Sequence, residues 1–160
     1  MARARGPQLA TELEALTSRI EAVVAGFSDE QWRGPCPNEG RSVAVVAFHV
    51  ADGSRYALAM LDAAISGGPY PDWVGATEAQ GAAINARQAM EHADVSVDDV
   101  LVLLRHNARL ASDFLRRLTD GELDEQPSFA PDHTTADIAE FALLGHPLSH
   151  LPNLIASSQR

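Results

Sequence analysis

Apolar positions recur every three or four residues over most of the chain, the period that places side chains on one face of an α-helix. From Pro7 to Phe27 this pattern predicts a first helix, with apolar positions at Leu9, Leu13, Leu16, Ile20, Val23, Val24 and Phe27. The stretch "SVDDVLVLLRHNARLASDFLRRL" repeats the pattern after Ser96 and Asp99, which resemble a capping box. Each segment is therefore predicted to be an amphipathic helix with one buried face.

Two further long helices follow from capping residues and breakers. Ser42 is a suitable N-cap for a helix that runs to about Ser66, where "SGGPYP" has the glycine-then-proline order of a helix end. Its buried stripe is expected to contain Val46, His49, Gly53, Tyr56, Ala57, Met60 and Ala64. The last helix, "ADIAEFALLGHPLSHLPNLIASS", is capped by Thr134 or Thr135 and is apolar on most sides, so we expect it to be buried on most sides.

The connections differ in length and content. "GFSDEQWRGPCPNEGRS" contains Gly and Pro and predicts a loop with at most one helical turn, capped by Ser28 with Gln31 and anchored by Trp32. "DWVGATEAQGAAINARQAMEHAD" predicts one shorter helix inside a long connection, as a lid or a crossover. The fold class expected is all-α: a four-helix bundle with a long connection carrying an extra short helix, a fold that builds sites from interior-facing side chains.

Composition agrees with this fold and narrows the partners. The 160 residues fit one domain over 1–160, and a 46% hydrophobic, 6% aromatic content favours helices. A net charge of -10 disfavours nucleic acid or an anionic membrane as a partner, and no apolar run reaches the roughly 20 residues of a membrane span. A single cysteine and the absence of a leader-like start predict a cytoplasmic protein.

Three of the six histidines stand out. His92, His106 and His133 have polar neighbours and are expected at the surface. His49 falls in a buried stripe, where an imidazole without a partner would cost about 1 to 3 kcal/mol. His146 and His150 are four residues apart, so on a helix their rings project from the same face.

This spacing is typical of a metal site. Imidazoles from adjacent turns can each place a nitrogen about 2.0 to 2.1 Å from one ion, with a third ligand from a facing helix. His49 is the candidate for that ligand, to complete a set with His146 and His150. The alternative is that the rings only bond to backbone or water. Because ligand imidazoles must be neutral, we expect metal affinity to fall below about pH 6.5.

Two prolines interrupt the last helix beside the histidine pair. Pro147 and Pro152 each remove the amide that would bond to the carbonyl four residues earlier. One interpretation is that the helix bends there and aims both rings. The other is that it breaks at Gly145 and restarts at Pro147, so that the two histidines no longer share a face.

The order of these segments resembles a known family. "LTSRIEAVVAGFSDEQW", "RSVAVVAFHVADGSRYALAML", "INARQAMEHADVSVDDVLVLLRHNARLASDFLRRL" and the closing histidine pair are similar to the DinB/YfiT-like superfamily, over nearly the whole chain. That superfamily includes mycothiol-dependent maleylpyruvate isomerases and related thiol S-transferases. The chain departs from it at Pro147, where members usually lack proline, and at Arg41, where a tryptophan often precedes the serine.

The resemblance implies a site and a reaction. It implies a divalent ion, zinc or nickel, held by His49 from the second helix and by His146 and His150 from the last, in a cytosolic and often dimeric protein. Three neutral imidazoles leave coordination positions open, and a thiol bound there would be deprotonated. The expected enzyme transfers a low-molecular-weight thiol (mycothiol, bacillithiol or glutathione) to a small electrophile, or isomerises it. The alternatives are a metal-dependent hydrolase and a non-catalytic protein that binds a small ligand or partner.

Auxiliary residues are chosen by their distance from the histidines in sequence. Three polar side chains lie within two turns of a histidine on its helix: Asp52, Tyr56 and Asn153. They are expected to orient an imidazole or to bind substrate, or to be ordinary polar residues. Three aromatic residues of predicted loops would wall a pocket or anchor the loop: Trp32, Tyr70 and Trp73. Cys36 has no histidine beside it and is expected to be unreactive.

Overall fold

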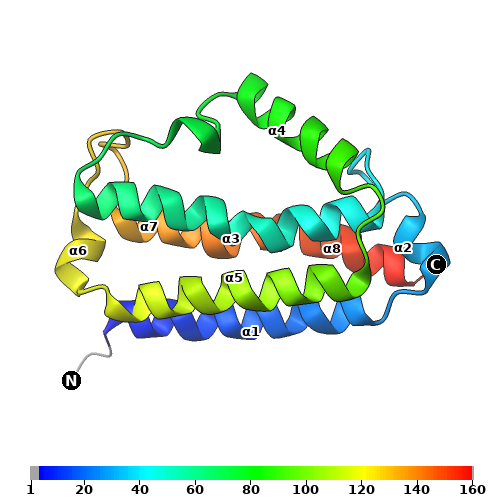
Figure 1. The fold of residues 1–160 in the computed structure, drawn as a ribbon. Helices are drawn as coiled ribbons and strands as arrows, with labels where there is room; N and C mark the ends of the chain where they lie inside the picture. Colours follow the sequence, from blue (N-terminus) through cyan, green and yellow to red (C-terminus); the bar gives the residue numbers. More distant parts are fainter. Residues whose placement is uncertain (1–3, 160) are drawn as a thin grey trace.

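Four long helices form two layers in the computed structural model, which describes residues 4–159 (Figure 1). They are α1 (Arg5–Ala25), α3 (Val43–Ser66), α5 (Val97–Arg117) and a C-terminal helix composed of α7 (Thr135–Ala139), the π-helical η2 (Glu140–Gly145) and α8 (His146–Ser158). In Figure 1, α1 and α5 run side by side below α3 and the C-terminal helix. The predicted all-α bundle is confirmed.

Shorter elements occupy the connections. They are α2 (Asp29–Arg33), the 3₁₀ turn η1 (Asp72–Val74), α4 (Glu78–Glu91) and α6 (Asp120–Asp124). The predicted short helix is α4, which arches over α3 in Figure 1. Only one of its residues, Gln88, is buried. The rest of α4 is therefore held over the bundle by few core contacts.

The helix ends follow the capping residues of the sequence. The side chains of Ser28, Ser42, Ser96 and Thr134 each accept a bond from the amide three residues later, as predicted. Gly67 ends α3 in the left-handed region, with φ of 68°. The boundaries of α3, which carries His49, are thus set by local chemistry.

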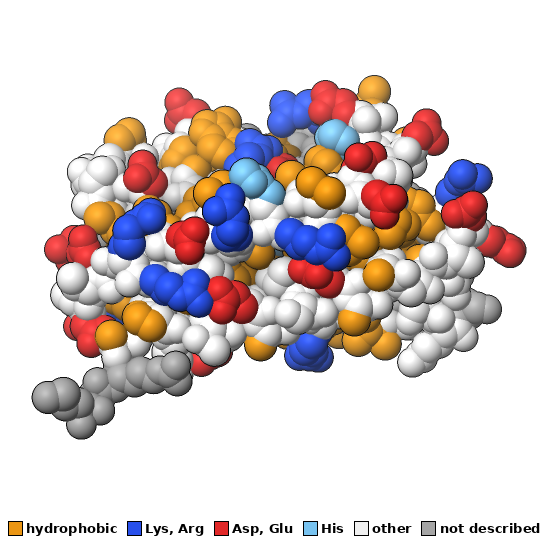
Figure 2. Space-filling model, turned by 60° about the horizontal axis from the view of Figure 1, so that its bottom comes forward, with side chains coloured by type: hydrophobic (Ala, Val, Ile, Leu, Met, Phe, Trp, Pro, Cys, Tyr) orange, Lys and Arg blue, Asp and Glu red, His pale blue; other side chains and the backbone are white. Residues whose placement is uncertain are grey.

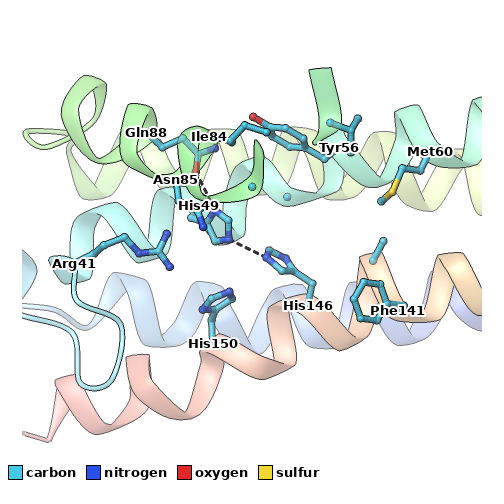
Figure 3. Close-up of a pocket in the computed structure, with 14 residues that line it drawn as sticks. Arg41, His49, Tyr56, Met60, Ile84, Asn85, Gln88, Phe141, His146 and His150 are labelled. Carbon is cyan, nitrogen blue, oxygen red and sulfur yellow. Dashed lines mark hydrogen bonds between the residues drawn. The ribbon is translucent and has the colours of Figure 1, made fainter. Parts of the chain in front are cut away.

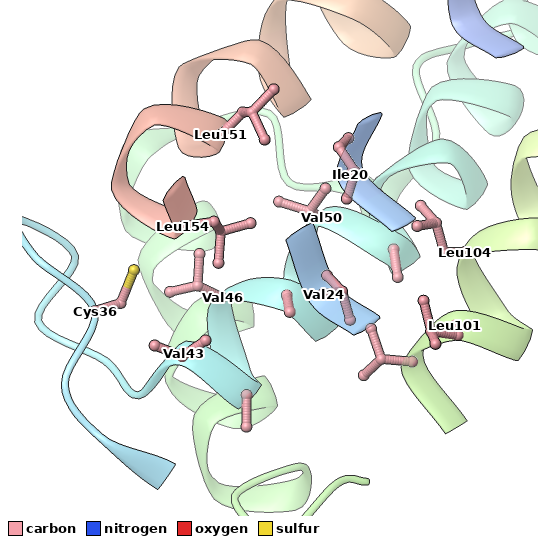
Figure 4. Close-up of a cluster of buried hydrophobic side chains, with 14 of the residues drawn as sticks. Ile20, Val24, Cys36, Val43, Val46, Val50, Leu101, Leu104, Leu151 and Leu154 are labelled. Atoms are coloured by element: carbon pink, nitrogen blue, oxygen red, sulfur yellow. The ribbon is translucent and has the colours of Figure 1, made fainter. Parts of the chain in front are cut away.

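The core consists of two clusters of buried side chains. The first joins α1, α3, α5 and α8; Figure 4 shows it around Ile20, Val24, Val43, Val46, Val50, Leu101, Leu104, Leu151 and Leu154. The second lies towards the other end of the bundle and includes Leu9, Leu13, Leu61, Leu115, Leu123 and Leu143. Each fully buried Leu or Val contributes about 1.5 to 3 kcal/mol, so these clusters fix α3 against α8.

The C-terminal helix does not break at its first proline. Gly145 and His146 both have helical φ and ψ, and the amide of His146 donates to the carbonyl of Phe141, five residues earlier. This wider π turn accommodates the missing amide and the bulky ring of Pro147. His146 and His150 keep a common face, with ring centroids 4.9 Å apart. The interpretation in which the helix breaks is therefore wrong.

Within residues 4–159, every helix is too short or too polar to cross a lipid bilayer.

The close crossing of α1 and α5 gives a test of the packing. A Cβ at Gly6 would collide with the carbonyl oxygen of Leu115 and lie 3.0 Å from that of Leu118. Gly6→Ala should therefore lower the free energy of unfolding by about 1 to 3 kcal/mol, measured by urea denaturation. Gly81→Ala is the matched control, because no atom lies within 4 Å of a Cβ there. The control should be neutral or stabilising by up to about 1 kcal/mol, and equal losses in both variants would contradict the close crossing.

Candidate metal centre

Three imidazoles converge between α3 and α8. His49 comes from α3, and His146 and His150 come from successive turns of α8 (Figure 3). One ring nitrogen of each lies within 4.8 Å of the others, and all three residues are half-buried. The Nε2 atoms of His49 and His146 are 2.9 Å apart. The predicted set of histidines is thus assembled in a form that could hold a metal ion.

The protonation of two of these rings suits a metal. Burial lowers the pKa of His49 to about 4, with further lowering by the charge of Arg41. Burial also lowers the pKa of His146 to about 4, followed by the effect of His49. Both rings are neutral at pH 7 and keep a lone pair for a cation. For these two rings, competition between protons and a metal is therefore expected near pH 4, below the value of about pH 6.5 expected from the sequence.

A row of hydrogen bonds fixes the orientation of His49. Arg55 donates from Nε and Nη2 to the two carboxylate oxygens of Asp52, both at 2.8 Å. Asp52 also accepts from the Gln88 amide nitrogen at 3.3 Å, so the amide oxygen faces Nδ1 of His49, at 2.9 Å. Because this oxygen can only accept, Nδ1 of His49 carries the proton. The lone pair is left on Nε2, which points to the other two histidines.

Glu39 orients the second ring. One of its oxygens accepts from Nδ1 of His150 at 2.8 Å and from the amide of Asn153 at 2.8 Å. The other accepts from Arg41 at 2.9 Å. Burial raises the pKa of Glu39, but the bonds from His150, Asn153 and Arg41 outweigh it and the net pKa is lowered. An ionised Glu39 therefore holds His150 with its Nε2 free for a ligand.

A tight loop before α3 carries Glu39 to this position. Asn38 and Gly40 have φ of 61° and 65°, the left-handed region that Asn and Gly tolerate best. The amide of Cys36 donates to the carbonyl of Arg41 at 2.8 Å and closes the loop. Sequence reasoning missed Glu39, and the "NEG" turn next to a helix start was the signal that could have found it.

A cavity of about 370 Å³ opens beside the three histidines, between α3, α4 and the C-terminal helix (Figure 3). Its apolar wall includes Tyr56, Met60, Val74, Ile84 and Phe141. Its polar end is formed by Arg41, His49, Gln88, His146 and His150, with Asn85 near them. A small ligand in this cavity would therefore touch the imidazoles at one end and an apolar surface at the other.

The structure places the auxiliary residues in different environments. Asp52 reaches His49 through Gln88, Tyr56 lines the cavity, and Asn153 bonds to Glu39. Trp32 does not line the cavity: it is only 5% exposed in the first core cluster. Its indole N–H donates to the carbonyl of Val95 at 2.8 Å, so its polar atom is used to hold a loop. The expectation that Trp32 forms part of the site is therefore corrected: this residue anchors a loop to the core.

The remaining candidates lie outside the polar end of the cavity. Trp73 packs on Tyr56, with ring centroids 5.2 Å apart, and Tyr70 donates to the Gly75 carbonyl. Cys36 is buried in the first core cluster. His106 and His133 are exposed, as expected, whereas His92 is half-buried and stacks on the ring of Phe48.

Comparison with known families agrees with the fold and with the histidines. A family model described as the DinB superfamily matches residues 12–151. The chain belongs to the DinB superfamily. The matched range contains His49, His146 and His150. No curated protein and no solved structure gives a significant match to the chain.

Gln88 should control metal affinity in this DinB-superfamily protein without touching the metal. Gln88→Leu removes the acceptor that fixes the proton of His49 on Nδ1. Loss of such an orienting bond typically weakens metal binding about 10- to 100-fold, which zinc titration against a chelating dye would measure. Arg87→Leu, at the exposed neighbouring position, is the control and should leave affinity unchanged. Equal affinities of the two variants would show that Gln88 does not orient the ring.

The lowered pKa values predict acid sensitivity of the metal-free protein. The unfolded chain binds protons on His49 and His146 from about pH 6.5, but the folded chain binds them only near pH 4. Stability should therefore be complete above about pH 6.5 and fall as the pH drops towards 4, by on the order of a few kcal/mol for the two coupled rings together. Urea unfolding across this range should show a shallower fall for His146→Gln than for the surface control His106→Gln. The same slope in both variants would contradict the assignment.

Proposed function

We propose that His49, His146 and His150 bind one divalent ion, zinc or nickel, and that the protein is a metal-dependent enzyme of small thiols. In this proposal it transfers a thiol of the mycothiol, bacillithiol or glutathione type to a small electrophile, or isomerises that electrophile. One observation supports it above all. Three imidazoles, two of them neutral through burial, converge at the wall of an open cavity.

The donor set fits a catalytic ion better than a structural one. Closed structural zinc sites usually have four protein ligands, whereas three histidines leave a position for a substrate atom. When bound, a divalent ion acidifies a thiol and so supplies a thiolate at neutral pH. The three histidines line the polar end of the cavity. A sulfur atom on the ion and an electrophile in the cavity can therefore be brought together there.

The chain's own residues have three tasks in this reaction. Gln88 and Glu39 hold His49 and His150 in single orientations. The apolar wall, which includes Tyr56, Met60 and Ile84, binds the apolar part of the electrophile beside the reacting sulfur. In a transfer, sulfur forms a bond to carbon while the leaving group departs from that carbon with its electron pair, and the thiol proton passes to solvent.

Metal content and thiol dependence test this function. Protein purified without an affinity tag, or reconstituted with zinc, should contain about one ion per chain. His150→Ala should lose that ion with its helical circular dichroism retained, because the ring is a ligand and not part of the core clusters. His106→Ala, on the exposed face of α5, should keep it.

The reaction class is tested on a halogenated dinitrobenzene with and without each of the three thiols. We expect consumption only when a thiol is present, and loss of that activity in His150→Ala. Equal turnover without thiol would make the protein a hydrolase and overturn the transferase. Absence of metal after reconstitution would overturn both enzymes and favour a protein that binds a small ligand or partner in the cavity.

A further inference from the structure

Arg41 brings a permanent positive charge into the polar end of the cavity. In Figure 3 its guanidinium extends from the loop before α3 towards His49 and His150. The side chain is only 14% exposed, and its Nη2 pairs with Glu39 at 2.9 Å. Its Nη1 is buried and has no hydrogen-bond partner. A buried donor without a partner is uncommon in folded proteins, so the described residues do not use the full hydrogen-bonding capacity of this guanidinium.

Arginines on the outer surface have a different environment. Figure 2 shows the face formed by α1 and α5, where blue and red side chains alternate. Arg105 pairs there with Glu21 at 3.0 Å and Arg116 with Glu14 at 2.7 Å. These guanidinium groups are exposed, and each is paired with a carboxylate of the protein. Arg41 shares its one carboxylate, Glu39, with His150 and Asn153.

The composition of the cavity also favours an anion. The chain has 22 Asp and Glu residues and a net charge of -10. Yet none of the described residues that line this cavity is Asp or Glu, and Arg41 is the one Lys or Arg among them. A divalent ion at the imidazoles would add two positive charges to that of Arg41. The negative charge of Glu39 balances one of these three, so two positive charges would remain. A thiolate would neutralise one, and a second anionic group would neutralise the other.

We propose that the electrophile carries a carboxylate and that the guanidinium of Arg41, which lines the cavity, binds it. This inference deepens the proposed function and rests on it for the role of the ligand as the electrophile. A guanidinium is always charged and donates in a planar fork that matches a carboxylate. The remainder of the ligand lies against the apolar wall, and a cavity of about 370 Å³ limits it to a small molecule.

Matched pairs of acids and amides test the carboxylate directly. Cinnamate with cinnamamide, and phenylbutyrate with its amide, are titrated calorimetrically into zinc-free and zinc-loaded protein. Each pair has the same apolar part and differs in charge. The wild type should bind each acid about tenfold more tightly than its amide in both forms, the effect of one charge-assisted pair. In zinc-free protein no metal is present to bind the carboxylate, so this arm isolates Arg41.

Substitutions at Arg41 assign the effect. Arg41→Gln should reduce the preference for the acid to within about twofold, while amide binding stays as in the wild type. Arg41→Lys keeps the charge but loses the fork and should give an intermediate preference. Arg105→Gln, on the outer face of α5, should behave as the wild type. Zinc content of each variant is measured in parallel.

Each outcome decides for or against the proposal. A wild type that binds neither acid, or binds acid and amide equally, overturns it. A preference that persists in Arg41→Gln, or that appears only with zinc, places the carboxylate elsewhere and overturns it as well. Failure of the proposed function has a separate signature: an Arg41-dependent preference in a protein that takes up no zinc would support the carboxylate site and refute the metal enzyme.

Discussion

Burial of three imidazoles at one point between α3 and α8 is the constraint on which the rest of the site depends. Burial and the charge of neighbouring groups both oppose a proton on His49 and on His146. The lowered pKa of His49 and of His146 expresses that constraint. Neutral rings must then be hydrogen-bonded in a defined tautomer, and this requirement recruits residues from other parts of the chain.

Two of the recruited residues come from elements outside the four long helices. Gln88 is the one buried residue of α4, and it serves His49 on one side and Asp52 on the other. Glu39 stands in a tight loop and serves His150, Asn153 and Arg41. The hydrogen bonds that orient the imidazoles therefore also attach α4 and this loop to the bundle. Site geometry and the position of the cavity walls are coupled through the same contacts.

These hydrogen bonds also determine which polar groups line the cavity. Carboxylates near the site are turned away from the cavity: Asp52 faces Arg55 and Gln88, and Glu39 faces His150 and Asn153. What remains at the surface of the cavity is imidazole, amide and guanidinium, opposite apolar side chains. A strongly acidic protein thus has a cavity lined by one arginine, by uncharged polar groups and by apolar side chains, without a carboxylate among the described residues.

The sequence by itself determined the helices, their caps and the three histidines. Serine N-caps, the three-and-four spacing and the His146–His150 interval act within a few residues, so local chemistry is enough to read them. Tertiary structure decided the π turn that accommodates Pro147, the place of Trp32 in the core, and the roles of Glu39, Arg41 and Gln88. Most of these features depend on contacts between segments that are far apart in the sequence. The hydrogen bond between Glu39 and His150, for example, cannot be predicted from the apolar spacing of either segment.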